Sequence, residues 1–454
     1  MTDRLDRWLW APIDPASLAV FRIVFGLCGL LGAVRYVGFG WVELLYVTPS
    51  WSFGWLPDAL PAPGPWLYAV YLTLAVASVG VAAGAFRRAS ITLFVASFLT
   101  IELQDQTNYL NHYYLMTLVG IGLAAMPADA AWSVDGWRDP RRLRATIPAW
   151  TVNALRLQLG LVYLFAGIAK LDAQWLAGHP LDIWLATRSS LPVLGPWLVQ
   201  PWLAPAMAIA GCAYDLTVPL WLALPRTRGA AYLVVVGFHV AVGVLFNIGV
   251  FPLLMIGLTP VFFDPSWPRR LAARRPVAIG AARGAARPSG LAVRRWVAPA
   301  LAGWFAVQLV VPLRHLAYPG DVTWTEEGFR FAWRFLLVEK RGFFRYQVTD
   351  PATGQRWTVR PEDELTDRQR HEASFHPEML LQYAHHLRDR FGADGHPGVR
   401  ITCDAWVSVN GGASARLIDP TVDLAAEPAW TLAPRRWILP APSAVGVAVS
   451  ARGP

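Results

Sequence analysis

Residues 154–175 read ALRLQLGLVYLFAGIAKLDAQW, and Lys170 is the first charge after the apolar run that ends at Ala169. The chain has 40 lysines and arginines, yet only Lys170 and Lys340 are lysines. Arginine cannot give up its proton at any usable pH, whereas lysine can. Two interpretations stay open. Lys170 snorkels at a membrane interface, paired with Asp172, or it supplies an amine that can lose its proton.

The composition indicates a polytopic membrane protein. Of 454 residues, 55% are hydrophobic and only 16% are charged, whereas soluble domains have about 25% charged residues. The net charge of +9 is therefore expected to reflect basic cytoplasmic loops and not a nucleic-acid partner. Cys28, Cys212 and Cys403 have no paired or CxxC spacing, so we expect neither a disulfide framework nor a metal site. The N-terminus is too acidic and too short of apolar residues for a cleaved signal peptide.

A helix that crosses a bilayer needs about 20 mostly apolar residues. The sequence offers nine candidate spans, at residues 16–36, 66–85, 89–104, 109–126, 151–169, 202–224, 229–246, 250–263 and 296–314. Only Asn247–Gly249 separates the seventh from the eighth, so this pair forms two spans or one broken re-entrant hairpin.

Arginines collect in alternate connections, at residues 4–7, 87–88, 138–144, 226–228 and 269–295, while the intervening connections contain only Lys170 and Arg188. Basic residues mark cytoplasmic loops. The pattern predicts nine spans, a cytoplasmic N-terminus, and Lys170 at the outer end of the fifth span.

The composition divides the chain into a helical membrane domain, residues 1–316, and an extracytoplasmic α+β domain, residues 317–454. In the second, strands are expected at Phe344–Val348, Gln355–Val359 and Val399–Val409, a hairpin loop at Asp350–Gly354, and a helix at His376–Phe391. The Arg-, Ala-, Gly- and Pro-rich residues 268–295 are expected to form a flexible cytoplasmic loop.

Polar side chains inside spans are functional candidates by default. Asn111 and His112 open the fourth span at the outer side, level with Lys170, and His239 lies in the seventh. Arg22 and Gln158 are further polar groups at membrane depth, and Arg156 and Asp215 are expected to form an internal ion pair. The chain has no HExxH, P-loop, nucleophile-elbow or GxGxxG motif. An amine and an imidazole at the outer edge of an aromatic-rich bundle suit proton abstraction from a lipid-soluble quinol.

These residues are similar to those of the vitamin K-dependent gamma-glutamyl carboxylases and their bacterial HTTM relatives. The resemblance runs from about residue 14 to residue 424. It is carried by the segments Asp14–Arg22, Asn111–His112, Trp132–Gly136, Ala166–Trp175, Phe238–His239, Pro265–Pro268, Trp324–Thr325, Trp333, Ala405–Asn410 and Asp419–Asp423.

The resemblance implies that Lys170 deprotonates reduced vitamin K hydroquinone, or a related menaquinol. Oxygen then adds to give the epoxide and a strong base, which removes a glutamate γ-proton before CO2 is captured. It assigns His112 to stabilising the reacting charge. We expect a bacterial inner-membrane location, a glutamate-containing peptide or protein as substrate, and quinol contacts from Asn111, Asp172, Trp175, His239 and Trp333.

Departures from the family favour the quinol half of this chemistry. Phe329 and Phe331 stand where the family has tyrosines of its glutamate site, Val338 stands where it has a histidine, and Cys403 has no partner for the animal disulfide. The alternatives are a quinol epoxidase without carboxylation and a non-catalytic membrane binding or assembly protein. A transporter is a weaker alternative, because we find no internal repeat.

Overall fold

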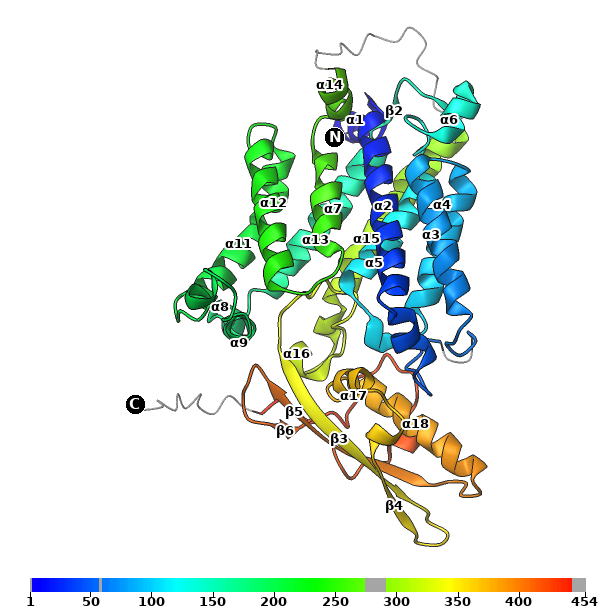
Figure 1. The fold of residues 1–454 in the computed structure, drawn as a ribbon, viewed down its shortest axis with the longest axis vertical. Coiled ribbons are helices and arrows are strands. Elements are labelled where there is room, and N and C mark those ends of the chain that lie inside the picture. Colours follow the sequence, from blue (N-terminus) through cyan, green and yellow to red (C-terminus); the bar gives the residue numbers. More distant parts are fainter. Residues whose placement is uncertain (1, 57–58, 274–290, 443–454) are drawn as a thin grey trace.

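The computed structural model describes residues 2–56, 59–273 and 291–442, and shows a helical bundle with a smaller helix-and-sheet unit at one end (Figure 1). The main helices of the bundle are α2 (Ala16–Gly38), α3 (Leu67–Ala83), α4 (Arg87–Glu102), α5 (Asn111–Ala125), α7 (Trp150–Ala169), α11 (Leu203–Ala223), α12 (Arg228–Leu245), α13 (Phe251–Leu258) and α15 (Leu291–Leu313). A 3-10 turn, η4 (Thr259–Phe262), extends α13.

Each segment expected to span the membrane coincides with one of these helices. Five helices of the described chain are long and apolar enough to cross a membrane, namely α2, α7, α11, α12 and Arg295–Ala317. The others are shorter, so the count of nine spans stays a prediction. The short α13 follows α12 closely, which leaves both interpretations of residues 229–263 open.

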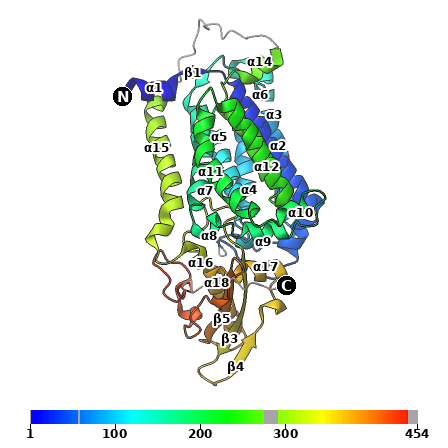
Figure 2. The same ribbon diagram turned by 90° about the vertical axis from the view of Figure 1, so that its left-hand side faces the viewer.

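Short elements cover both ends of the bundle. At the end away from the sheet lie α1 (Thr2–Trp10), the strand pair β1 (Pro12–Ile13) and β2 (Ile147–Pro148), α6 (Val134–Arg138) with the turn η3 (Pro140–Arg142), and α14 (Trp267–Ala273) (Figure 2). At the sheet end lie η1 (Glu43–Val47), η2 (Gln106–Asn108), α8 (Ala173–Leu176), α9 (Leu181–Ala186) and α10 (Gly195–Leu198). The expected loop at 268–295 is wrong at its two ends, which belong to α14 and α15; residues 274–290 lie outside the described chain.

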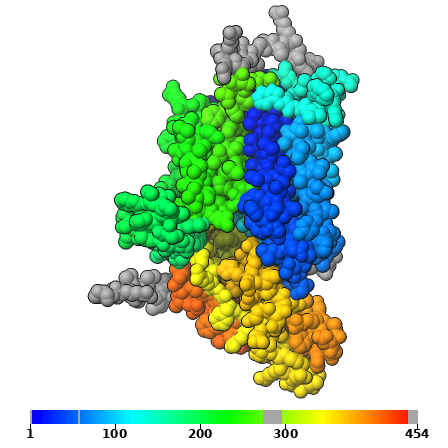
Figure 3. Space-filling model, viewed as in Figure 1, coloured from blue at the N-terminus to red at the C-terminus, as the bar shows by residue number. Residues whose placement is uncertain are grey.

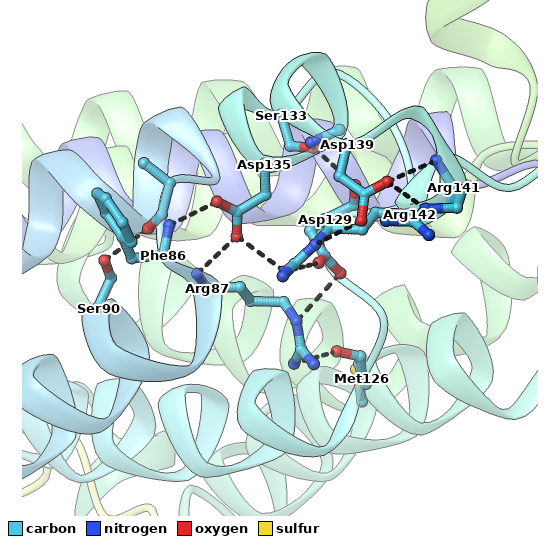
Figure 4. Close-up of polar contacts among 12 residues, drawn as sticks. Phe86, Arg87, Ser90, Met126, Asp129, Ser133, Asp135, Asp139, Arg141 and Arg142 are labelled. Carbon is cyan, nitrogen blue, oxygen red and sulfur yellow. Dashed lines mark hydrogen bonds and ion pairs between the residues drawn. The ribbon is translucent and has the colours of Figure 1, made fainter.

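Polar contacts fix the end of the bundle away from the sheet (Figure 4). The carboxylate of Asp135 accepts hydrogen bonds from the backbone N–H groups of Phe86 and Arg87, at 2.8 and 2.9 Å, and so caps the start of α4. Arg87 in turn pairs with Asp129 at 3.0 Å. The buried Arg22 donates to the carbonyls of Val81, Ala82 and Trp132. The motif Trp132–Gly136 and Arg22 therefore brace the helices.

Two glycines allow close helix packing. A β-carbon on Gly26 of α2 would lie 2.5 Å from the backbone nitrogen of Ala82 in α3. A β-carbon on Gly167 of α7 would lie 2.8 Å from the backbone nitrogen of Leu216 in α11. Any larger side chain at Gly167 would push α11 away from α7.

The unit at the other end contains a four-stranded antiparallel sheet of order β4-β3-β5-β6. Its strands are β3 (Lys340–Thr349), β4 (Arg356–Val359), β5 (Arg400–Val409) and β6 (Ala415–Arg416), and its helices are α16 (Val322–Thr325), α17 (Asp367–Ala373) and α18 (Pro377–Ala393). Three further 3-10 turns are η5 (Arg314–Ala317), η6 (Pro361–Asp363) and η7 (Leu424–Ala426). The buried side of the sheet packs on α18, where the Tyr346 hydroxyl donates to the Leu380 carbonyl at 2.7 Å. The expected strands, hairpin and long helix are all present, with small shifts of their ends.

We call this sheet-containing part, residues 322–442, the outer unit. It sits directly against the bundle, as Figure 3 shows. Arg368 of α17 donates to the side chain of Asn108 and to the carbonyl of Thr107, at 3.0 and 2.9 Å. Arg330 pairs with Glu378 and also donates to Gln106. These contacts join η2, which directly precedes α5, to α17 and α18.

Candidate active site

A cavity of about 850 Å³ lies between the sheet end of the bundle and the outer unit. Its wall combines residues of α2, α5, α7, α11, α12 and α13 with residues 326–340 and 368–376. Both lysines of the chain, Lys170 and Lys340, line it. It is large enough for a fused aromatic ring. Its wall combines aromatic and aliphatic side chains with charged and polar ones, so it can enclose an apolar ring and contact polar groups on it.

Lys170 caps the C-terminus of α7 and forms a buried ion pair with Asp215 of α11. The Nζ atom lies 2.8 Å from Asp215 Oδ2, and the two side chains are 8% and 7% exposed. Nζ also contacts the Ala166 carbonyl at 3.4 Å. Both side chains of the pair line the cavity.

Local packing positions this pair. Gly167 lets α11 approach α7, and the thiol of Cys212, one turn before Asp215, lies 3.7 Å from the Gly167 carbonyl. The indole of Trp175 stands on the other side, with its ring centre 5.4 Å from Lys170 Nζ and its N–H donating to Ala208. The ammonium is therefore held between a carboxylate and an aromatic face.

The expected partners of Lys170 and Asp215 were both wrong. Arg156 does not pair with Asp215; its guanidinium donates to the carbonyls of Val261 and Phe263, both at 2.8 Å, where the 3-10 turn after α13 leaves them free. Asp172 does not pair with Lys170, because its carboxylate accepts from the backbone nitrogens of Gln174 and Trp175 and caps α8.

Two histidines lie along the apolar part of the cavity, with Phe251 between them. The ring of Phe251 is 5.6 Å from the ring of His112 and 5.8 Å from that of His239, centre to centre. The Nδ1 atom of His239 faces the Val235 carbonyl at 2.9 Å, so Nδ1 bears the hydrogen and Nε2 is free to accept one. His239 also packs edge-on against Tyr163 and Tyr214, the residue next to Asp215.

The outer end of the cavity holds a second lysine pair. Lys340 Nζ contacts Glu326 Oε1, and the Nε2 atom of His376 lies 3.6 Å from Glu326 Oε2. Burial raises the pKa of Glu326, although the charge of Lys340 opposes this. Burial, helped by the charge of Arg330, holds the pKa of His376 well below its usual value. This pair lies within a network of charges, unlike the pair at Lys170.

The structure brings together five of the seven expected site residues. Lys170, His112, Asn111, Trp175 and His239 line the cavity, whereas Asp172 and Trp333 do not. Asn111 donates to the Arg334 carbonyl at 3.0 Å and so ties α5 to the outer unit. Trp333 is fully buried and stacks on Tyr114. Roles for Asp172 and Trp333 in ligand binding stay predictions.

Asp215 is the functional candidate whose role sequence reasoning missed. Its position in an apolar run marks it as a charge at membrane depth, but its partner depends on the contact of α7 with α11 at Gly167. One signal was available: Gly167 and Lys170 are three residues apart and so share one side of the helix end.

No group of histidine, cysteine, aspartate and glutamate side chains in the described residues is arranged to hold a metal ion. Cys28, Cys212 and Cys403 are free and buried, which agrees with the expected lack of a disulfide framework.

Two family models match the chain. The model of the HTTM domain matches residues 10–267, more than half of the sequence, and the model of the lumenal domain of vitamin K-dependent gamma-carboxylase matches residues 293–444. No solved structure matches it. The two matches lie in the order that the helical and sheet-containing parts follow in the structure. With an HTTM domain followed by a gamma-carboxylase lumenal domain, the chain belongs to the vitamin K-dependent gamma-carboxylase family.

Proposed function

We propose that this protein is an integral-membrane enzyme that oxidises a lipid-soluble quinol, reduced vitamin K or menaquinol, with molecular oxygen, and that Lys170 and Asp215 together accept the proton of the quinol hydroxyl. The observation that carries the proposal is the buried Lys170–Asp215 pair in the wall of a largely apolar cavity. The quinol is a substrate here. When bound, it supplies with oxygen the strong base for carboxylation.

The proton balance distinguishes the pair from a lone amine. At rest, an ammonium and a carboxylate share one ionic hydrogen bond of 2.8 Å. The quinol O–H bond breaks and its electron pair stays on the quinol oxygen. The proton passes to Lys170 as Lys170 gives one of its own protons to Asp215, so Asp215 ends protonated. The pair changes from net neutral to a single positive charge, which stabilises the new negative charge beside it.

His112, Asn111, Trp175 and His239 are proposed to hold the ring. Their side chains give the cavity aromatic faces and polar edges, the combination that orients a flat ligand with two hydroxyls. His239 Nε2 is a free acceptor for such a hydroxyl. The ring of His112 lies edge-on to Tyr113 and tilted to Phe251. We propose that His112 stabilises the developing negative charge.

Carboxylation of a glutamate-containing peptide or protein with CO2 is proposed as the second half-reaction. It is supported by the lumenal-domain match and by the extension of the cavity to the outer unit. The alternative, quinol epoxidation without protein carboxylation, is favoured by Phe329 and Phe331, which offer no hydroxyl. The ring of Phe331 is enclosed by Trp55, Tyr109 and Tyr114.

The proposed orientation places the N-terminus in the cytoplasm and residues 317–454 outside, in a bacterial inner membrane. Several arginine-bearing elements, α1, α6 and α14, lie together at the end of the bundle away from the sheet. This gathering of basic residues at one end is what the positive-inside rule requires.

The decisive assay uses purified protein, a reduced naphthoquinol, oxygen and labelled carbonate, with and without a glutamate peptide. The proposal expects quinol-dependent oxygen uptake and epoxide. Label in the peptide adds carboxylation, whereas epoxide without label supports the alternative. A folded protein that forms neither product from either quinol contradicts the proposed enzyme and favours a binding or assembly role.

A further inference from the structure

Arg35, in the last turn of α2, lines the cavity without a carboxylate partner. Its guanidinium lies over two aromatic rings, 5.3 Å from the ring centre of Trp41 and 5.9 Å from that of Phe39. Within the described chain its guanidinium makes no ion pair and no hydrogen bond. The other cavity cations all have polar partners. Lys170, Lys340 and Arg330 pair with carboxylates. Arg368 donates to Asn108 and Thr107, and Arg334 contacts His315 Nε2.

A second observation places a ligand position beside Arg35. Gly249 has a φ of +65°, and a β-carbon built on it would lie 3.5 Å from Arg35 NH1 and 4.0 Å from His112 Nε2. Two side-chain nitrogens thus approach one point in the cavity wall where the chain has no side chain. His112 is buried and makes no hydrogen bond with any residue that the structure describes.

We propose that Arg35 and His112 form an oxyanion site over Gly249, a second position, besides the Lys170–Asp215 pair, where negative charge on the substrate is held. The inference rests on the proposed function for the identity of its ligand, an oxygen anion either of the deprotonated quinol or of bicarbonate. Arg35 donates from NH1 and His112 donates from Nε2, so the site holds an anion between two N–H groups. The apolar wall strengthens the interaction by keeping water out.

The acids of the cavity support this assignment. Asp215 and Glu326 form ion pairs with Lys170 and Lys340, respectively. The carboxylate of Glu339 accepts hydrogen bonds from Trp184 and Arg341. Glu102 and Glu372 also line the cavity, but neither forms an ion pair with Arg35 in the described structure. An anionic ligand therefore meets an unneutralised guanidinium.

The test measures binding and needs no turnover. The probe is an alkylated hydroxynaphthoquinone, whose coloured anion absorbs visible light, and the matched neutral probe is its methoxy derivative. Arg35→Gln is expected to weaken binding of the anion about ten- to a hundredfold, the usual effect of losing one charge-assisted hydrogen bond. Binding of the methoxy probe should stay within about twofold, because it brings no charge to the site.

The control is Arg138→Gln. Among the described residues the guanidinium of Arg138 likewise has only a ring contact, with Phe86 at 4.8 Å, but its helix, α6, lies at the opposite end of the bundle (Figure 1). Arg35→Lys should keep part of the affinity, which separates loss of charge from misfolding. Competition by bicarbonate identifies the inorganic anion as the ligand, and its absence identifies the quinol anion. Equal binding of the coloured anion by wild type and Arg35→Gln overturns the inference. If binding is equal but the wild type still forms epoxide, only this inference fails and the proposed function holds.

Discussion

The two lysines of the chain form the same kind of pair in two different surroundings. Lys170 and Asp215 meet at the ends of packed helices, with one indole face and an apolar wall around them. Lys340 and Glu326 join the first residue of β3 to the residue after α16, between the rings of Phe329 and Phe375. Only the second pair has further charged neighbours, His376 and Arg330.

The difference indicates two roles for one chemical motif. A pair within a network of charges can exchange partners, so its main effect is to hold the segment 326–340 in place. The isolated pair has one carboxylate that can accept a proton and one ammonium whose charge can balance that of an anionic ligand. A proton taken from a ligand therefore remains on this pair. A buried ion pair adds little net stability compared with apolar side chains of similar size. A purely structural role therefore does not explain the isolated pair.

The largest expected effect is on quinol turnover by Lys170→Arg. Arginine preserves the ion pair with Asp215 but cannot pass on its proton. Turnover should fall at least about a hundredfold, the range for losing a positioned acid–base group. The measurement is epoxide formed per enzyme.

The matched control is Lys340→Arg, which makes the same replacement in the pair held by the charge network. It should keep turnover within about threefold, well below the effect of losing an acid–base group. Equal losses in both variants would remove the proposed distinction between the pairs.

The next effect is the pH profile of Asp215→Asn. Without the carboxylate, the remaining amine must first lose its proton, and a free lysine does so only near pH 10.4. We expect turnover to be reduced about tenfold or more at neutral pH and to rise steadily with pH, whereas the wild type stays level there. An Asp215→Asn profile that follows the wild type at all pH values contradicts a role for the carboxylate.

Gly167→Ala tests the same pair without changing a charge. The added β-carbon would lie 2.8 Å from the Leu216 backbone, so α11 must move and Asp215 with it. Turnover should fall by about three- to tenfold, because misplaced catalytic groups lose rate steeply with distance. Gly160→Ala on the same helix is the control, since its β-carbon meets its nearest neighbour at an ordinary 3.8 Å.

Acid stability tests the charge network of the outer unit. Burial keeps the pKa of His376 well below its usual value, so below about pH 6.5 the unfolded chain binds a proton that the folded protein does not. Stability therefore falls as the pH is lowered from about 7 to about 5, by up to about 1.4 kcal/mol per pH unit for this group. The raised pKa of Glu326 acts in the opposite direction, because the folded protein takes up that proton first.

The His376 contribution is isolated by comparing unfolding free energies of His376→Gln and wild type across this range. The variant should lose stability less steeply towards acid pH. Parallel curves would show that His376 is protonated in the folded protein.

The smallest effect is expected for Arg345→Gln on the exposed side of the sheet. Arg345 lies 3.3 Å from Asp404 but is 60% exposed, and Asp404 keeps Arg416 as a partner. Exposed pairs contribute about 0.2 to 1 kcal/mol, so the unfolding midpoint should hardly change. A large drop would mean that surface pairs also stabilise the outer unit.

The sequence predicted the elements of the fold better than the contacts between them. Long apolar runs marked the bundle helices, and alternation marked β5, where Ile401, Cys403, Ala405 and Val407 are buried. Both signals are local, and the family resemblance added the order of the domains.

The partners of the charged groups could not be predicted in this way. The opposite charges of Asp215 and Arg156 predict an ion pair, but Arg156 donates to the carbonyls of Val261 and Phe263, more than a hundred residues away in the sequence. The positive φ values at Glu326, Phe331 and Trp333 also have no local signal, because non-glycine residues adopt them only when tertiary contacts enforce them.

The central claim is that Lys170 and Asp215 act as one base, and the scarcity of lysine allows a direct test. Protein labelled with nitrogen-15 at lysine side chains gives two Nζ signals, assigned with Lys340→Arg. The account predicts that in the wild type the Lys170 signal is that of an ammonium hydrogen-bonded to a carboxylate, and that Asp215→Asn shifts this signal. A Lys170 signal that is the same in the wild type and in Asp215→Asn would contradict the account.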